Sequence, residues 1–142
     1  MATADQLDLL RATLTGDFDR QNEIRARFAE DDWSGYGVLI GAAFFVAVRR
    51  RLGGGYAPAD VINLVAQVRS RFDPDGDTYD PRAAELLVRS ALGEDTPTQQ
   101  YSDKAVVGIQ TLTVGALAAD GGIGNIEEFI SKTDALAAKW DT

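Results

Sequence analysis

The chain of 142 residues has the length of one domain with a single hydrophobic core. It contains no cysteine and no histidine, which excludes disulfides and thiolate zinc sites and removes the side chain most often used in general acid–base catalysis. A net charge of −8 and a pI near 4.4 mean that the chain as a whole repels nucleic acids and anionic lipids. We therefore expect neither a nucleic-acid-binding protein nor a membrane protein.

The beginning of the sequence, Met1–Asp5, has neither the basic residues nor the apolar run of a signal peptide. We therefore expect a soluble, cytoplasmic protein. Arginine outnumbers lysine by a wide margin. This bias is typical of GC-rich bacterial genomes and carries no information about function.

Two helices are predicted at the start of the chain. Thr3 and Gln6 match a capping box, and leucines follow at helical spacing as far as Gly16, which predicts a helix over about 4–15. A second helix is predicted from about residue 17 to residue 30. Its apolar stripe is thin, so we expect most of this helix to face water.

The next helix is expected to be the centre of the fold. Residues 36–48 are all uncharged, and the glycines at 53–55 end the segment. A helix that is apolar on all sides lies either inside a bundle or in a membrane. A membrane span needs about 20 apolar residues, so we predict a core helix with Phe44 and Val46, or their neighbours, nearly fully buried. Gly37 and Gly41 form a GxxxG pattern, which lets another helix approach closely.

Three consecutive arginines follow this apolar segment. Arg49, Arg50 and Arg51 are the candidate contacts for an anion or for an acidic part of a partner. The structural alternative is that cations at the end of a helix oppose its dipole while their long stems cover apolar surface. Arg69 and Arg71 end the following helix, and an antiparallel pair of helices would place the two arginine groups at opposite ends. We therefore expect no continuous basic stripe and no nucleic-acid binding.

Four further helices are predicted after the glycines. Pro58 opens the first of them, Asp80 and Pro81 begin the second, and Asn125 caps the last. They cover residues 58–72, 81–92, 102–119 and about 125–140.

An aspartate-rich segment separates the helices predicted over 58–72 and 81–92. Asp73, Asp75 and Asp77 alternate as calcium ligands do in EF-hand loops, which makes them the candidate metal ligands. The pattern then fails, because Thr78 occupies the place of the required glycine and Ala84 that of the bidentate glutamate. The alternative is a solvated polar turn, and we expect no bound cofactor.

Together these elements predict an all-α fold. The chain 1–142 is expected to form a single-domain bundle of about seven helices around the central apolar helix. The helices over 58–72, 102–119 and 125–140 are expected to pack around that helix.

The function predicted from this sequence is that of a non-enzymatic helical interaction module: an adaptor, a regulator or an immunity-type protein. The absence of catalytic residue types and the acidic surface favour a protein partner of basic character. The alternative is a helical protein that binds a small molecule or a metal, for which a deep apolar pocket with convergent polar groups would argue. The third and weakest hypothesis is an enzyme that uses aspartate and tyrosine.

A homodimer is a further expectation. Phe129 and Trp140 fall on one face of the last helix, together with Ile126, Thr133 and Ala137. This apolar stripe must be covered by the first helix of the same chain or by a second copy, and two-fold dimers are the commonest oligomers.

Overall fold

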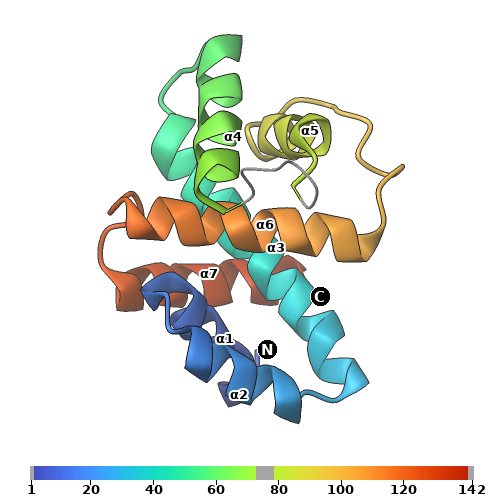
Figure 1. Cartoon of the computed structure of the whole chain (residues 1–142), viewed down its shortest axis with the longest axis vertical. Coiled ribbons are helices and arrows are strands. Elements are labelled where there is room, and N and C mark those ends of the chain that lie inside the picture. The colour runs from blue at the N-terminus through green and yellow to red at the C-terminus, as the bar shows by residue number, and fades with distance from the viewer. Residues whose placement is uncertain (1, 73–78, 141–142) are drawn as a thin grey trace.

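The computed structural model describes residues 2–72 and 79–140, and this part of the chain contains no strand. The all-α fold predicted from the sequence is confirmed. The helices are α1 (Ala4–Thr15), α2 (Phe18–Arg27), α3 (Glu30–Leu52), α4 (Pro58–Phe72), α5 (Pro81–Ala91), α6 (Asp103–Ala119) and α7 (Ile126–Trp140). They pack into one bundle (Figure 1).

Local capping fixes the start and the end of α1 as expected. The Thr3 hydroxyl accepts a hydrogen bond from the Gln6 backbone N–H at 3.2 Å, and the Gln6 side-chain oxygen accepts one from the Thr3 N–H at 2.8 Å. Gly16 ends the helix with a φ of 70°, which glycine adopts without steric cost.

The central helix α3 begins at Glu30, earlier than the predicted segment 36–48, and α2 ends correspondingly sooner, at Arg27. The charged residues before Trp33 belong to its first turn, where acidic side chains complement the helix dipole. Asp32 also caps the helix, because its carboxylate accepts a hydrogen bond from the Ala29 N–H at 2.9 Å. A helix can therefore start in a charged segment that periodicity alone assigns to the preceding connection.

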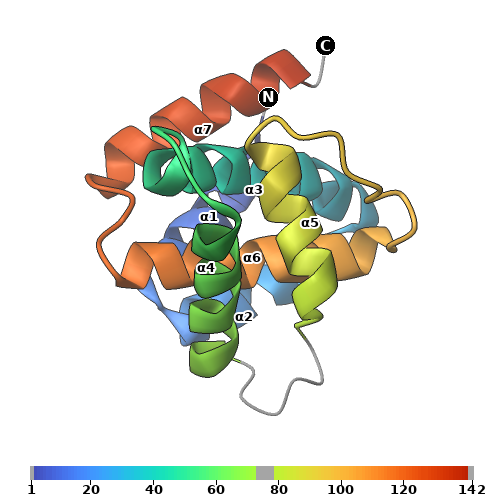
Figure 2. The same ribbon diagram turned by 90° about the horizontal axis from the view of Figure 1, so that it is seen from above.

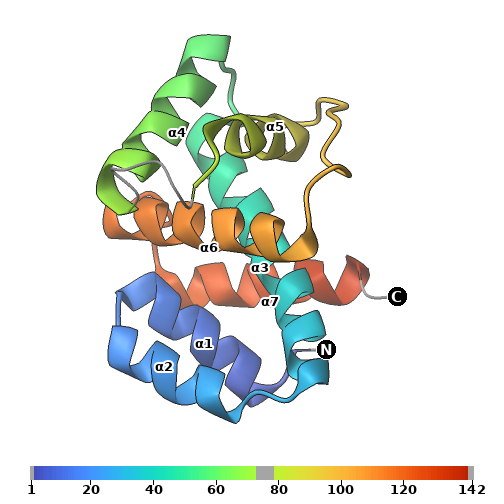
Figure 3. The same ribbon diagram turned by 45° about the vertical axis from the view of Figure 1, so that its right-hand side comes forward.

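Helix α3 runs through the middle of the bundle. It packs on α6 and α7, which lie on two sides of it (Figure 2), and also on α1 and α5. Its predicted partner α4 instead makes its contacts chiefly with α5 and α6, so the expected packing of α4 around α3 is wrong. Figure 3 shows the pair α1–α2 at one end of the molecule and the pair α4–α5 at the other. Within the described ranges, none of the helices is long and apolar enough to cross a membrane.

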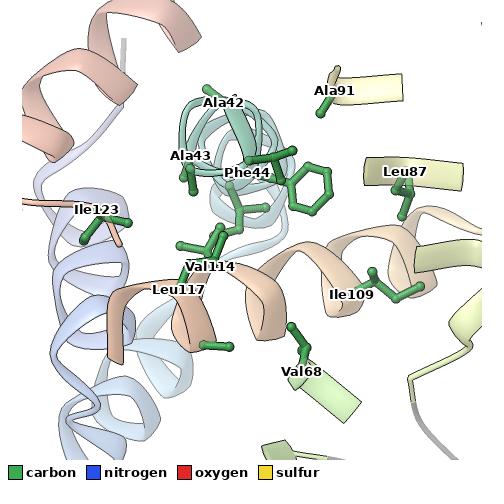
Figure 4. Close-up of a cluster of buried hydrophobic side chains, with 14 of the residues drawn as sticks. Ala42, Ala43, Phe44, Val68, Leu87, Ala91, Ile109, Val114, Leu117 and Ile123 are labelled. Carbon is green, nitrogen blue, oxygen red and sulfur yellow. The ribbon is translucent and has the colours of Figure 1, made fainter. Parts of the chain in front are cut away.

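The core contains the buried face of α3 and residues from every other helix. The contribution of α2 is small. Phe44 is 3% exposed, as predicted, and lies among side chains of α5 and α6 (Figure 4). Ala47, the neighbour of Val46, is 1% exposed as the prediction allowed, whereas Val46 itself is only half-buried. It lies two residues from Phe44, on the opposite side of the helix, and α3 is not enclosed on all sides.

Most of the stripe on α7 is covered within one chain, while Trp140 at its end is half-exposed. Phe129, Thr133 and Ala137 are buried, and α7 packs on α3 and α1. The stripe therefore does not by itself require a second copy. The homodimer stays a prediction, to be checked by light scattering at micromolar concentration.

The end of the segment predicted as a polar loop is anchored in the core. Tyr79 is fully buried, and its hydroxyl lies 2.7 Å from the hydroxyl of Thr113 on α6. Thr113 in turn donates to the carbonyl of Ile109 at 2.8 Å. Burial raises the pKa of the Tyr79 phenol to about 12, because the charged phenolate would lose its hydration.

Candidate functional site

A groove of about 840 Å³ lies on one face of the bundle between α3, α6 and the end of α7. Its walls are mostly apolar or small side chains. The lining residues are Trp33, Ser34, Gly37, Val38 and Gly41 of α3, Asp103, Lys104, Val106, Val107 and Gln110 of α6, and Trp140 of α7.

Helical periodicity explains why these residues share the groove. The α6 residues 103, 106, 107 and 110 follow the spacing of one helix face, and the α3 residues 33, 37 and 41 recur about once a turn. The two helix faces run side by side, since Gly37 lies beside Val107 and Gly41 beside Gln110. The groove therefore runs along two neighbouring helices for about two turns.

The chain's two tryptophans mark the ends of this groove. Trp33 is 42% exposed and Trp140 is 48% exposed. Each indole nevertheless packs edge-on against another ring, Trp33 against Phe28 at 4.8 Å between ring centroids and Trp140 against Phe45 at 5.6 Å. Aromatic pairs of this geometry are favourable beyond their buried area. Both rings are thus held in place while one side of each faces the groove.

The two glycines of the GxxxG pattern leave space rather than allow a close helix contact. A Cβ atom added to Gly37 would lie 3.8 Å from the nearest atom, on Val107, and one added to Gly41 would have its nearest neighbours at 3.9 Å. Both are ordinary van der Waals distances, so the close approach expected at these positions is not observed. On α3, it is Gly35 whose lack of a side chain permits a close contact, because a Cβ there would collide with the side-chain amide of Gln6.

We expect Gly37→Ala to raise the free energy of unfolding by about 0.5–1 kcal/mol, because alanine lowers the entropy cost of forming the helix and the added methyl meets no clash. Gly108→Ala is the matched control. It lies on α6 with open space around its Cβ position and outside the groove, so it should give the same gain. Urea denaturation of the two variants checks this. A loss of stability in Gly37→Ala alone would contradict the open space described here.

The three arginines are engaged within the chain. Arg50 forms an ion pair with Glu128, donating to each carboxylate oxygen at 3.0 Å, and also donates to the Ile123 carbonyl. Arg49 donates from Nε to the Ala91 carbonyl at 2.9 Å. These contacts tie the end of α3 to α5 and α7.

Arg51 contacts α4 through Gln67 at 3.4 Å. On α4, Arg71 pairs with Asp120 at 3.0 Å. The sequence-predicted anion contact at 49–51 therefore coincides with side chains that already have partners. An anion would have to displace those partners.

The candidate metal ligands Asp73, Asp75 and Asp77 lie outside the described residues, so the metal prediction is not tested. Within residues 2–72 and 79–140, no group of three or more acidic side chains is placed to hold a metal ion. In the same part of the chain, the buried polar side chains are amides and hydroxyls: Gln6, Thr13, Gln21, Thr113 and Thr133.

Sequence reasoning singled out the helices that form the groove but not the groove itself. Trp33 appears in the sequence as a residue before the apolar segment, and Trp140 as the end of a stripe. The sequence feature that could have indicated the groove is the recurrence of the small residues Ser34, Gly37 and Gly41 on one face of a long helix. Comparison with known protein families, curated proteins and solved structures gave no match.

Proposed function

We propose that this protein is a non-enzymatic interaction module that binds an apolar segment of a partner protein in the groove between α3, α6 and α7. The observation that carries the proposal is the position of the two half-exposed tryptophans at the ends of one apolar groove. Tryptophan is enriched among the residues that dominate binding energy at interfaces, because it offers a large rigid surface at a small entropic cost. An adaptor, a regulator or an immunity-type protein would use such a surface.

The distribution of exposed apolar side chains supports this surface over others. Among the described residues, the exposed large hydrophobic ones are Phe18, Trp33, Ile62 and Trp140, and two of these four line the groove. Exposed apolar side chains scattered singly are normal, whereas a contiguous patch indicates a binding site.

A small apolar molecule is the second candidate ligand. A volume of about 840 Å³ falls in the range of about 300–1,000 Å³ that is typical of ligand pockets. The groove is partly open to solvent, however, and would leave part of such a molecule exposed. An extended protein segment uses an open groove better, because it gains contacts along the whole length.

The test is selection of binding peptides from a random display library with the intact protein, followed by calorimetry. We expect Trp33→Ala to lower the affinity for the selected peptides by about 30-fold or more, as truncation of a dominant interface residue does. Phe18→Ala is the matched control, because it removes an aromatic ring that is 66% exposed on α2, outside the groove. It should leave the affinity unchanged.

Equal binding by wild type, Trp33→Ala and Phe18→Ala would show that the groove is not the site. Thermal unfolding of each variant is measured in parallel, since Trp33 also packs on Phe28. Trp140→Ala gives an independent variant at the other end of the groove. Binding of small apolar molecules in the absence of any selected peptide would instead support the second candidate.

A further inference from the structure

One end of the groove is acidic. Asp103 lines it directly, while Glu30 and Asp31 each lie three residues before a lining residue of α3, Trp33 and Ser34. A spacing of three residues places side chains on the same side of a helix. The basic side chain in the lining is Lys104. One carboxylate in the lining and two beside it therefore outnumber the one ammonium group at this end.

These three carboxylates form no ion pair with any other described residue. Some acids at the start of other helices do have partners, as Asp5 pairs with Arg27 at 2.9 Å and Glu127 with Arg11 at 2.8 Å, whereas Asp19 at the start of α2 is also unpaired among the described residues. Favourable interaction with the helix dipole explains why acids occur at the starts of α3 and α6. It leaves their charge available to a basic group in solution.

The groove has small residues between two tryptophans, and this shape fits a helix. Side chains of a helix form ridges that pack into grooves, and small residues on the facing helix allow closer contact. From Trp33 to Gly41 the groove follows α3 for about 12 Å, given a rise of about 1.5 Å per residue. About two turns of a bound helix would therefore lie between the two tryptophans. No strand edge is present in the described ranges, so a partner cannot bind there by strand addition.

We propose that the groove takes an amphipathic helix whose basic residues lie at the Trp33 end. This inference rests on the proposed function and specifies its partner. Apolar side chains spaced three and four residues apart fill the floor beside Val106 and Val107. Arginine or lysine side chains at one end approach Glu30, Asp31 and Asp103.

The experiment uses the intact protein labelled with fluorotryptophan. Because the chain has two tryptophans and both line the groove, each of the two fluorine resonances reports on one end of it. The probes are two alanine-based helical peptides of about 14 residues, long enough to form helix on binding. Both carry leucines at the same helical spacing, and one ends in two arginines while the other ends in two glutamates.

We expect the arginine peptide to shift both resonances and to bind about fivefold more tightly than the glutamate peptide at low salt, with the difference falling as salt is added. Asp103→Lys should reduce this preference about threefold or more. Asp19→Lys is the matched control, because it makes the same charge change in the first turn of α2, outside the groove. It should leave most of the preference in place.

The outcomes separate the two proposals. If both peptides shift the resonances with equal affinity, or if Asp19→Lys acts as strongly as Asp103→Lys, the basic helix is wrong while binding in the groove stands. If neither peptide shifts a resonance although library-selected peptides bind, the partner segment is not a helix. If no peptide of either experiment binds in the groove, both proposals fail.

Discussion

Replacing Phe44 by alanine is expected to lower the free energy of unfolding by about 3–5 kcal/mol. The Phe44 ring projects from α3 into the core of the bundle, among residues of α5 and α6, and the residue is 3% exposed (Figure 4). Its removal costs the transfer energy of the ring and leaves a cavity between three helices that cannot all close on it. A loss of this size is a large part of the total stability of a domain.

Urea denaturation followed by far-ultraviolet circular dichroism measures this loss. Phe18→Ala is the matched control, since its ring is 66% exposed and its removal should change the stability by less than about 0.5 kcal/mol. Similar small losses in both variants would mean that α3 is not enclosed by α5 and α6.

Stability is expected to fall above pH 10 because of Tyr79. Its pKa is raised from 10.0 to about 12 in the folded protein. Between these values the unfolded chain has lost the phenolic proton while the folded chain keeps it, so the unfolded state binds fewer protons and stability decreases as the pH rises. This contribution is fully present below pH 10 and is reduced by about 2 kcal/mol at pH 12.

Tyr79→Phe isolates this contribution. At pH 7 the variant should be less stable than wild type by about 1 kcal/mol, because the hydrogen bond to Thr113 is lost. The difference should shrink and reverse as the pH approaches 12. Tyr36 also has a raised pKa, through burial, so part of the alkaline loss remains in the variant. Parallel curves for the two proteins from pH 9 to pH 12 would contradict the burial of the Tyr79 hydroxyl.

The ends of most helices could be predicted because local chemistry determines them. Thr3, Asp80 and Ser102 accept hydrogen bonds from the first backbone N–H groups of their helices, and Pro58 and Pro81 occupy first-turn positions. These interactions lie within one turn of the chain, so the sequence contains all of their determinants.

Features that depend on tertiary contacts could not be predicted in the same way. The burial of Tyr79 depends on Thr113, which is distant along the chain. The packing of α4 on α5 and α6 depends on the angle at which each pair of helices crosses, and a hydrophobic stripe does not encode that angle. The groove is still harder to predict, because it exists where three helices fail to fill the space between them.

The pairing of early and late helices constrains how the chain can reach its native state. Helix α1 packs on α6 and α7, and Arg11 of α1 bonds to Glu127 of α7 through two nitrogen atoms at 2.8 and 2.9 Å. During synthesis, the faces of α1 and α3 that pack on α6 and α7 therefore stay uncovered until those later helices have emerged from the ribosome. We therefore expect the bundle to complete its fold only after α6 and α7 have emerged, and nascent chains arrested before residue 103 should be sensitive to proteases and dependent on chaperones.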